Sequence, residues 1–370
     1  MDDYQTSSLT HTWAPSSLLE NLDIQYAHVW CGGKTLAEVC PEDLSNRWQN
    51  VNKKAMAYLK SFHATKINLE DVCFYDLVPE KFLMDFYGIK NEITSHVFKT
   101  YKKPKNHDFL RDLIFFIKKI QGRQVNVEVS DADYSSSSAR NAISKIKNKN
   151  RKILYNPWKA VTGRLTTETN SFPILTLNKD LRGLIKPHND VFVELDFNSA
   201  ELRVLLGLLG QQQPSQDIHS WIAKEVFKNK YEREEVKKKV FAWLYNPNAK
   251  NKKLNEFLNR DQIYETYFLN DRVVTPYHRN ISVKKDKAVN YLIQSTASDM
   301  LLTAAMRIDN ILKNRKSFVS FCIHDSVILD MSADDKELIS SIQTAFSKTM
   351  FGDLKTNLSM GKNFGEMRRL

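Results

Sequence analysis

The sequence predicts an α+β protein, in which a few strands are set among many helices. Two β-rich segments, 191–197 and 318–331, each contain an aspartate at or near the end of a strand. Apolar residues recur at helical spacing on both sides of these segments. The chain has 370 residues, of which 42% are hydrophobic. It is therefore long enough for two or three compact units with a sizeable core.

The region 79–150 reads as helices that carry a basic loop. The first expected helix has its apolar residues three or four positions apart and ends near Pro104; they are Phe82, Phe86, Ile89, Ile93 and Val97. The second ends at Gly122 and contains Leu110, Leu113, Ile114, Ile117 and Ile120. A basic segment at 145–152 follows, where Lys145, Lys147 and Lys149 are candidates for phosphate contacts. A solvated basic loop is the alternative, and residues 1–78 indicate only a globular, mixed segment.

From about residue 160 the sequence predicts both strands and helices. The strand at 191–197 leads into a helix at 200–209, and Asp217 is a candidate N-cap for a helix through Phe227. A helix over 232–245 must stop there because Pro247 disfavours the α conformation of the residue before it. A long amphipathic helix is expected over 287–312. Strands at 318–323 and 327–331 are joined by a tight turn at 324–326.

Charge and composition narrow the class of partner. Lys and Arg number 54 against 43 Asp and Glu, for a net charge of +11, and such an excess favours a polyanion. The acidic start Met1-Asp2-Asp3-Tyr4 does not resemble a signal peptide, and no apolar run reaches membrane-spanning length. The four Cys have neither metal-site spacing nor the number that a disulfide framework needs. We therefore expect an intracellular protein without a membrane partner.

Asp196 and Asp325 are the first candidates for chemistry. A carboxylate next to Leu195 and Phe197 is costly to bury unless it is paired or binds a metal ion. If the two strands are neighbours in one sheet, the two carboxylates could hold a pair of Mg²⁺ ions for a phosphoryl transfer. The alternative is structural: Asp196 caps the following helix and Asp325 is a turn residue.

The expected helix at 232–245 carries a second pattern. Arg233, Lys237, Phe241 and Tyr245 stand four residues apart and therefore lie along one face. Two cations followed by two aromatic rings suit a triphosphate that lies beside a base. The alternative is a surface helix that buries its aromatic residues in the core.

Seven short motifs follow one another in the second part of the chain. In order they are TGRLTT at 162–167, DFNSAELR at 196–203, DIH at 217–219 with EVF at 225–227, Arg233-x3-Lys237-x3-Phe241-x3-Tyr245, NxxxQxTAxD at 290–299, IHD at 323–325 and GKNFGEM at 361–367. Over roughly residues 160–370 these motifs and their order resemble family A DNA polymerases, which include the bacterial repair polymerase and many phage replicases.

The resemblance implies DNA-templated addition of deoxynucleotides to a primer, with release of pyrophosphate, in DNA replication. Asp196 and Asp325 would bind two Mg²⁺ ions, for which Mn²⁺ could substitute, and Lys237 would donate a proton to the pyrophosphate. The residues implied at the incoming nucleotide are His219, Arg233, Lys237, Phe241, Tyr245 and Glu201, the last blocking a ribose 2′-hydroxyl. The residues implied at the primer–template are Arg164, Asn290, Gln294 and His324.

The resemblance also implies a right-hand polymerase with an antiparallel-sheet palm, helical fingers and a reduced helical thumb. The expected parts are an N-terminal region of uncertain role at 1–78, a thumb-like region at 79–160, palm at 161–215, shortened fingers at 216–287 and palm again at 288–370. No D-x-E exonuclease signature occurs before residue 160. Any proofreading or processivity factor would then be a separate polypeptide. We expect a monomer in the cytoplasm of a bacterial or phage-infected cell.

Several positions depart from the family pattern. Ser326, Asn246 and Ser295 replace a Glu, a Gly and a Gly, and Asp286 stands where an Arg is expected. Asn246 can adopt the left-handed conformation, so the helix end could survive.

Two other functions stay open. A single-subunit RNA polymerase also has two metal-binding aspartates, although Glu201 disfavours it. A non-catalytic DNA-binding remnant is disfavoured because the catalytic residues are retained.

Overall fold

The computed structural model describes residues 30–31, 34–67, 74–129, 140, 143–144, 146, 151–246, 249 and 251–370. The candidate phosphate contacts Lys145, Lys147 and Lys149 lie outside the described residues. The chain divides into two compact units, residues 1–111 and 112–370, with the boundary inside helix α8 (His107–Gln121). The mixture of helices with antiparallel sheets confirms the expected α+β class.

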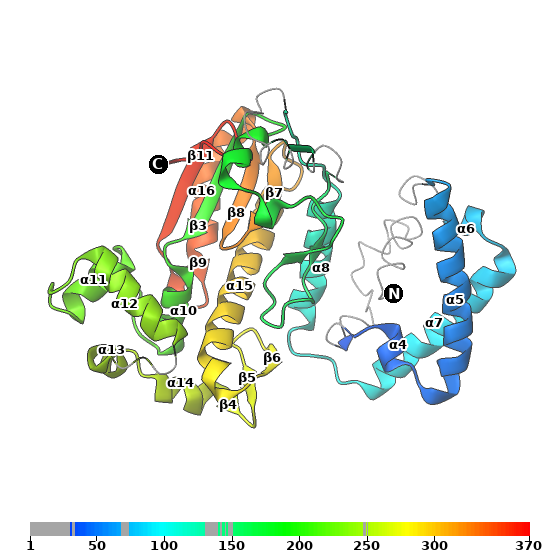
Figure 1. Ribbon diagram of the computed structural model, residues 1–370, viewed down its shortest axis with the longest axis horizontal. Helices are drawn as coiled ribbons and strands as arrows, with labels where there is room; N and C mark the ends of the chain where they lie inside the picture. Colours follow the sequence, from blue (N-terminus) through cyan, green and yellow to red (C-terminus); the bar gives the residue numbers. More distant parts are fainter. Residues whose placement is uncertain are drawn as a thin grey trace. The chain divides into compact units, whose positions relative to one another are not determined.

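The described part of the first unit is helical (Figure 1, blue and cyan). It contains α4 (Leu36–Val39), α5 (Glu42–Ala64), α6 (Phe74–Leu77) and α7 (Glu80–Thr100). The core between α5 and α7 includes Trp48, Val51, Phe86, Ile89 and Ile93. The spacing of three, four and seven residues between Trp48, Val51, Ala55 and Phe62 accounts for α5, which we did not expect from the sequence.

A five-stranded antiparallel sheet forms the centre of the second unit, in the order β12-β11-β3-β8-β7. Its strands are β3 (Val191–Phe197), β7 (Phe318–Ile323), β8 (Ser326–Met331), β11 (Thr356–Gly361) and β12 (Arg368–Arg369). Strand β3 lies between β8 and β11, so every residue from Val191 to Asp196 has a partner on β8. This central position explains why β3 is largely apolar.

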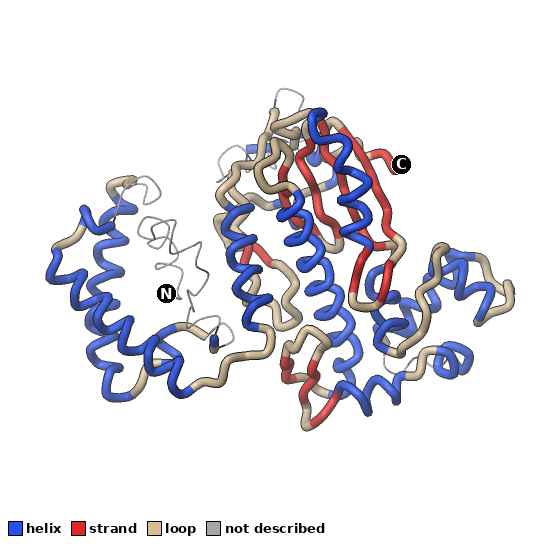
Figure 2. Tube along the Cα trace, turned by 180° about the vertical axis from the view of Figure 1, so that it is seen from behind, coloured by secondary structure: helices blue, strands red, loops and turns tan. Residues whose placement is uncertain are grey.

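Helices cover one face of the sheet, as the view from behind shows (Figure 2). Helix α15 (Lys285–Ile311) packs against β7, β8 and α10 (Ala200–Leu208), and α16 (Ile339–Ser347) packs against β3 and β11. The rings of Phe197 on β3 and Phe346 on α16 stack with centroids 4.3 Å apart. The apolar side of each helix is thus buried against the sheet that carries Asp196.

A smaller helical group lies between α10 and α15 in sequence (Figure 1, green to yellow). Its helices are α11 (Ile218–Glu225), α12 (Arg233–Tyr245), α13 (Lys252–Phe257) and α14 (Arg260–Tyr267). A three-stranded sheet of β4 (Phe268–Leu269), β5 (Arg272–Val274) and β6 (Asn280–Ser282) follows. The indole of Trp243, 1% exposed, donates to Asn255 and lies under the Arg260 guanidinium, and it therefore anchors α12 to α13 and α14.

The remaining elements are short. They are β1 (Tyr155–Asn156) paired with β2 (Thr166–Thr167), β9 (Lys348–Thr349) paired with β10 (Gly352–Asp353), and the 3₁₀ turns η1 (Ile174–Thr176), η2 (Lys179–Leu184) and η3 (Ala333–Leu338). Within the ranges that the structure describes, no helix is both long and apolar enough to cross a membrane.

The helices and strands expected from the sequence match α7, α8, β3, α10, α11, α12, α15, β7 and β8 closely. Asp217 caps α11 as expected, accepting a hydrogen bond from the Ser220 amide. The end of α12 at Tyr245 survives as expected, but Asn246 does not adopt the left-handed conformation: its φ of −107° and ψ of 107° are extended, and its amide donates to the Ala242 carbonyl. The end of α12 therefore needs no left-handed residue.

Candidate functional site

The two candidate aspartates meet at one end of the central sheet. Asp196 on β3 is the cross-strand partner of Ser326 on β8, and Asp325 occupies the turn immediately before Ser326. His324 in this turn has a φ of 49°, in the left-handed region that tight turns use. Because a hairpin tip places its side chains beside the end of the neighbouring strand, the two carboxylates come together across 129 residues of sequence.

Asp196 does not cap the helix that follows it. Ser199, with a φ of 55°, is the N-cap of α10, while Oδ1 of Asp196 accepts a hydrogen bond of 2.7 Å from Nδ2 of Asn357. Burial raises the pKa of Asp196; the Asn357 hydrogen bond opposes this, and the negative charges of Glu194 and Asp325 add to it. A cation between Asp196 and Asp325 would relieve that repulsion.

The two aspartates provide few metal ligands, which suits a cation whose other ligands come from water and from the substrate. Among the residues that the structure describes, no group of three or more His, Cys, Asp or Glu could hold a metal ion. Asp196 and Asp325 offer carboxylate oxygens only. Mg²⁺ in phosphoryl-transfer sites is commonly held by one or two carboxylates, and water and substrate phosphates complete its shell. The two carboxylates therefore suit Mg²⁺ bound together with a phosphate substrate.

Glu201 connects two other site residues. One of its carboxylate oxygens accepts a hydrogen bond from the Arg164 guanidinium, and the other accepts one from the Tyr245 hydroxyl. Its side chain is 11% exposed, so the carboxylate is largely enclosed by these partners. Burial first, and then the Glu201 hydrogen bond, raise the pKa of Tyr245 above its usual range. The TGRLTT loop, α10 and α12 are thereby joined through one side chain.

The two candidate aromatic residues of α12, Phe241 and Tyr245, lie on its surface rather than in the core. Phe241 and Tyr245 are 36% and 41% exposed, and their rings are nearly parallel, at 9° and 5.7 Å between centroids. The apolar face of α12 is formed instead by Val236, Val240, Trp243 and Leu244. Two exposed, parallel rings are surfaces on which a base can stack.

His219 lies behind this aromatic pair. Its ring is 6.0 Å from that of Phe241, and Nε2 lies 3.1 Å from the Ser199 hydroxyl. Its Nδ1 atom is buried and has no hydrogen-bond partner among the described residues. Burial lowers the pKa of His219; Asp217 opposes this, and Arg233 and Lys237 add to it. The imidazole is therefore neutral at neutral pH.

The two candidate phosphate ligands of α12, Arg233 and Lys237, differ in their surroundings. Nε and Nη2 of Arg233 each donate to Asp217 at 3.0 Å, which forms a bidentate pair. Although burial of Asp217 acts in the opposite direction, the hydrogen bonds from Arg233, Ser220 and Asn198 hold the pKa of its carboxyl well below the usual range. Lys237 is exposed and forms no ion pair with a described residue. Of these two side chains, Lys237 is the one that an anion can reach without displacing a carboxylate.

Asn290 and Gln294 mark one half-exposed face of α15, which is otherwise largely buried. They lie one turn apart, and Nε2 of Gln294 donates to Oδ1 of Asn290 at 2.7 Å. Ser298 follows a turn later and donates to the Gly163 carbonyl at 3.1 Å. This face therefore leads along α15 toward the TGRLTT loop.

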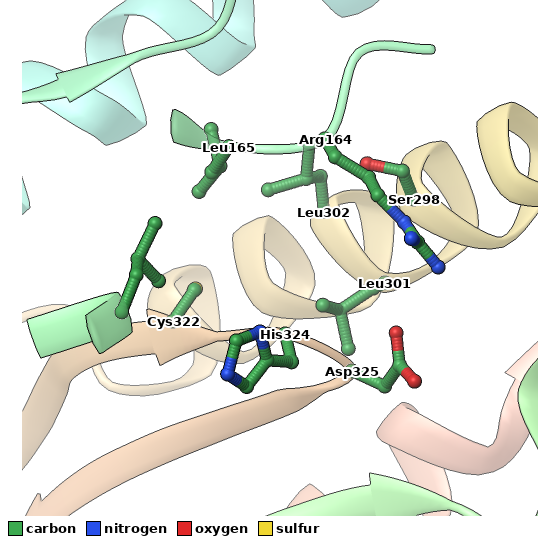
Figure 3. A pocket seen from close by; sticks show the side chains of 9 residues that line it. Arg164, Leu165, Ser298, Leu301, Leu302, Cys322, His324 and Asp325 are labelled. Atoms are coloured by element: carbon green, nitrogen blue, oxygen red, sulfur yellow. The ribbon is translucent and has the colours of Figure 1, made fainter. Parts of the chain in front are cut away.

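A pocket of about 300 Å³ lies where α15, the TGRLTT loop and the β7–β8 turn converge (Figure 3). Arg164 and Asp325 stand at one side of it, and Leu165 and Cys322 at the other. The remaining lining residues are Leu175, Ser298, Leu301, Leu302 and His324. The pocket therefore has a charged side next to the candidate metal site and an apolar side beyond it.

Sequence reasoning missed Arg279, which holds the TGRLTT loop in place. Nε and Nη2 of Arg279 donate to Asp299 at 2.7 and 2.9 Å, and Asp299 is completely buried. Gly163 has a φ of 73°, and a Cβ atom there would lie 2.4 Å from the Arg279 guanidinium carbon. The glycine thus allows the loop to rest on the ion pair. Arg279 lies outside the seven motifs, whereas the glycine within TGRLTT was a usable signal.

Comparisons with known proteins give distant similarity. No protein-family model matches the chain. The sequence is 20% identical over 265 residues to DNA polymerase I of Borreliella burgdorferi, covering 56% of this chain and 29% of that protein. The chain therefore spans less than a third of the length of this relative. The polymerase domain of Pol1 from M. smegmatis, solved with DNA primer-template and dNTP, superposes with a TM-score of 0.49 at 13% identity, over 70% of this chain and 65% of that one.

Proposed function

We propose that this chain, a family A DNA polymerase-like protein, is a DNA-templated DNA polymerase that extends a primer 3′-hydroxyl and releases pyrophosphate. The observation that carries the proposal is the meeting of Asp196 and Asp325 at the end of the central sheet, beside the Glu201–Tyr245 pair. In this proposal the sheet is the palm, residues 216–287 are shortened fingers and residues 79–160 are thumb-like.

Asp196 and Asp325 would hold two Mg²⁺ ions together with the triphosphate. The bound ions would lower the pKa of the primer hydroxyl and neutralise charge that develops on the leaving pyrophosphate. Lys237 has its ammonium exposed on α12 and would supply a proton to the pyrophosphate oxygen. Arg233 would bind the triphosphate only after it exchanges the Asp217 carboxylate for a phosphate, since both acceptors use the same guanidinium donors.

Glu201 and Tyr245 would select deoxyribose. Their hydrogen bond holds the Tyr245 ring, which is nearly parallel to that of Phe241, so the incoming base would stack on a rigid surface. By resemblance to the family, Glu201 would occupy the space below the sugar. The hydrogen bond from Tyr245 would hold the Glu201 carboxylate there. A ribose 2′-hydroxyl would then need the space that this carboxylate already fills.

Arg164, Asn290, Gln294 and His324 would contact the primer–template, largely through its minor groove. The acceptors of the minor groove are nearly the same for every base pair, so these contacts would test the shape of a pair without reading its sequence. A polymerase needs that tolerance because it must copy any template. Support comes from Ser298, which follows Gln294 by one turn on α15 and lines the pocket together with Arg164 and His324.

Primer extension with Mg²⁺ tests the proposal. The wild-type chain should add nucleotides as the template dictates, and Asp196→Ala and Asp325→Ala should each abolish growth. Asp353→Ala is the matched control because Asp353 is exposed on β10, outside the site, and it should extend normally. Growth that survives either site substitution unaltered would refute the metal-binding role.

Incorporation of deoxynucleotides and ribonucleotides tests the selection by Glu201. Wild type should prefer deoxynucleotides, and Glu201→Ala should reduce the preference because the space below the sugar is opened. Equal use of both by wild type would instead support the single-subunit RNA polymerase. A wild-type chain that binds primer–template and adds neither would support the non-catalytic alternative.

A further inference from the structure

Asp196 lies in a row of three residues that crosses the central sheet. Its cross-strand partners are Asn357 on β11 and Ser326 on β8. Directly opposed residues in a sheet project to the same face, so the Asn357 side chain stands beside the Asp196 carboxylate. The hydrogen bond of 2.7 Å from Nδ2 of Asn357 to Oδ1 of Asp196 follows from this register.

A second contact fixes Asn357 in turn. Arg369 on β12 pairs with Ser359, two residues beyond Asn357 on the same strand, and therefore points to the same face. Such a diagonal neighbour is within reach of a long side chain. The Arg369 guanidinium donates to Oδ1 of Asn357. The order across the sheet is thus guanidinium, amide and carboxylate.

The hydrogen bonds along this row can run in only one direction, from the guanidinium through the amide to the carboxylate. A guanidinium only donates and an ionised carboxylate only accepts, so a residue between them must accept on one side and donate on the other. The amide of Asn357 does both, and its orientation is determined by its two neighbours. An Asp at this position would lack the donor, and a Leu would lack both groups.

The amide also keeps the Arg369 guanidinium from pairing directly with Asp196, although its positive charge still acts to lower the pKa of that carboxyl. A guanidinium paired directly with that carboxylate would compete with a cation for the same oxygens. Through Asn357, Arg369 instead stabilises an amide that engages Oδ1 and leaves Oδ2 for a cation. Carboxylates that bind metal ions are commonly oriented by hydrogen bonds of this kind.

We propose that Asn357 and Arg369 are positioning residues: Arg369 orients the Asn357 amide, and this amide orients the Asp196 carboxylate for a divalent cation and keeps the guanidinium off its oxygens. The inference rests on the proposed function, because it requires Asp196 to be a metal ligand. Sequence reasoning assigned no role to either residue.

Binding of Mn²⁺ to the full chain with primer–template and a non-hydrolysable deoxynucleotide analogue provides the test, with free Mn²⁺ measured by electron paramagnetic resonance. Asn357→Leu and Arg369→Gln should each weaken Mn²⁺ binding about 10-fold, the lower end of the range for residues that support a ligand. Arg369→Lys keeps a donor and should recover most of the affinity. Primer–template affinity, measured without metal, should change little in Asn357→Leu.

Arg368→Gln is the matched control, since it removes the same charge from the neighbouring position of β12. It should bind Mn²⁺ as wild type does. The inference is overturned if Asn357→Leu and Arg369→Gln both bind Mn²⁺ as tightly as wild type does, although Asp196→Asn binds it more weakly. If Asp196→Asn binds Mn²⁺ as wild type does, the metal site of the proposed function is itself wrong. Thermal melting of each variant separates these outcomes from unfolding.

Discussion

Glu201 holds two groups that the proposed reaction uses for different purposes. Arg164 is a candidate contact to the primer–template, whereas Tyr245 belongs to the proposed nucleotide site, and both donate to the same carboxylate. Arg164 is 42% exposed, so the pair can open toward a ligand. Primer binding through Arg164 would therefore break its bond to Glu201 and leave Glu201 with Tyr245 alone.

The substitution Glu201→Gln separates these two functions. The glutamine carbonyl can still accept from Tyr245, but the charged partner of Arg164 is lost. We expect primer–template affinity to rise a few-fold, measured by fluorescence anisotropy, because Arg164 no longer has to leave a carboxylate. Glu235→Gln, which removes an equal charge from the exposed surface of α12, is the control. Equal gains in both variants would mean that net charge, and not release of Arg164, is responsible.

The buried Asp299 should give the stability of the protein a measurable pH dependence. Burial raises the pKa of Asp299 to about 6, although the Arg279 charge and hydrogen bonds oppose it. At a pH between about 4, the ordinary pKa of an aspartate, and about 6, its pKa in the folded state, Asp299 binds a proton in the folded chain but not in the unfolded chain. Its contribution to stability is therefore present at low pH and is lost as the pH rises through 6.

Asp299→Asn removes this titration. On lowering the pH from about 7 to about 5, the free energy of unfolding of wild type should rise by about 1 kcal/mol relative to Asp299→Asn. Urea unfolding of both proteins across this range is the measurement. Parallel profiles would contradict the prediction and would mean that Arg279 keeps the carboxylate ionised throughout.

At the scale of elements, the edge strand β7 depends on a residue far away in sequence. The Tyr155 hydroxyl donates to the Cys322 carbonyl at 2.6 Å and accepts from the Cys322 amide at 3.1 Å. Arg123 also donates to the Val319 carbonyl at 3.1 Å. These side chains satisfy backbone groups on the side of β7 where the described residues add no further strand. Because β7 leads into the turn of His324 and Asp325, Tyr155 supports the candidate metal site.

Tyr155→Phe leaves the Cys322 backbone groups buried without this partner. We expect a loss of about 1–3 kcal/mol in the free energy of unfolding, the cost of a buried unsatisfied polar group. The measurement is urea denaturation, with Tyr267→Phe as the control because Tyr267 is only partly buried. A loss no larger than that of the control would show that β7 does not depend on the hydroxyl.

Local patterns predicted the elements that carry the site, while contacts between distant segments could not be read from the sequence. Strand β3 and helix α12 follow from apolar runs and from a four-residue spacing, both of which are local. Neither the Arg279–Asp299 pair nor the bridge from Tyr155 to β7 has such a signal, because each depends on how segments far apart in the chain meet. The roles assigned to the site residues stay predictions until the variants are measured.

For the whole molecule, the net charge of +11 predicts how binding depends on salt. A protein that neutralises phosphates releases counterions, so the logarithm of the association constant falls linearly with the logarithm of the salt concentration. If the chain contacts about 6–10 phosphates, affinity should fall about 10³–10⁵-fold between about 50 and 200 mM salt. Changing the base sequence of the primer–template should have little effect, since the expected minor-groove contacts are nearly degenerate.

The basic segment at 145–152 should account for part of this dependence. Replacing Lys145, Lys147 and Lys149 together by Gln should reduce the slope by about 1 for each lysine that contacts a phosphate. The control replaces Lys53, Lys54 and Lys60, which are exposed on α5, and lowers the net charge by the same amount. If the segment binds DNA, the salt dependence of binding becomes shallower in its variant and stays unchanged in the control. The reason is that the slope depends on the number of phosphates contacted and not on net charge. Equal behaviour of the two variants would mean that the segment is a solvated loop.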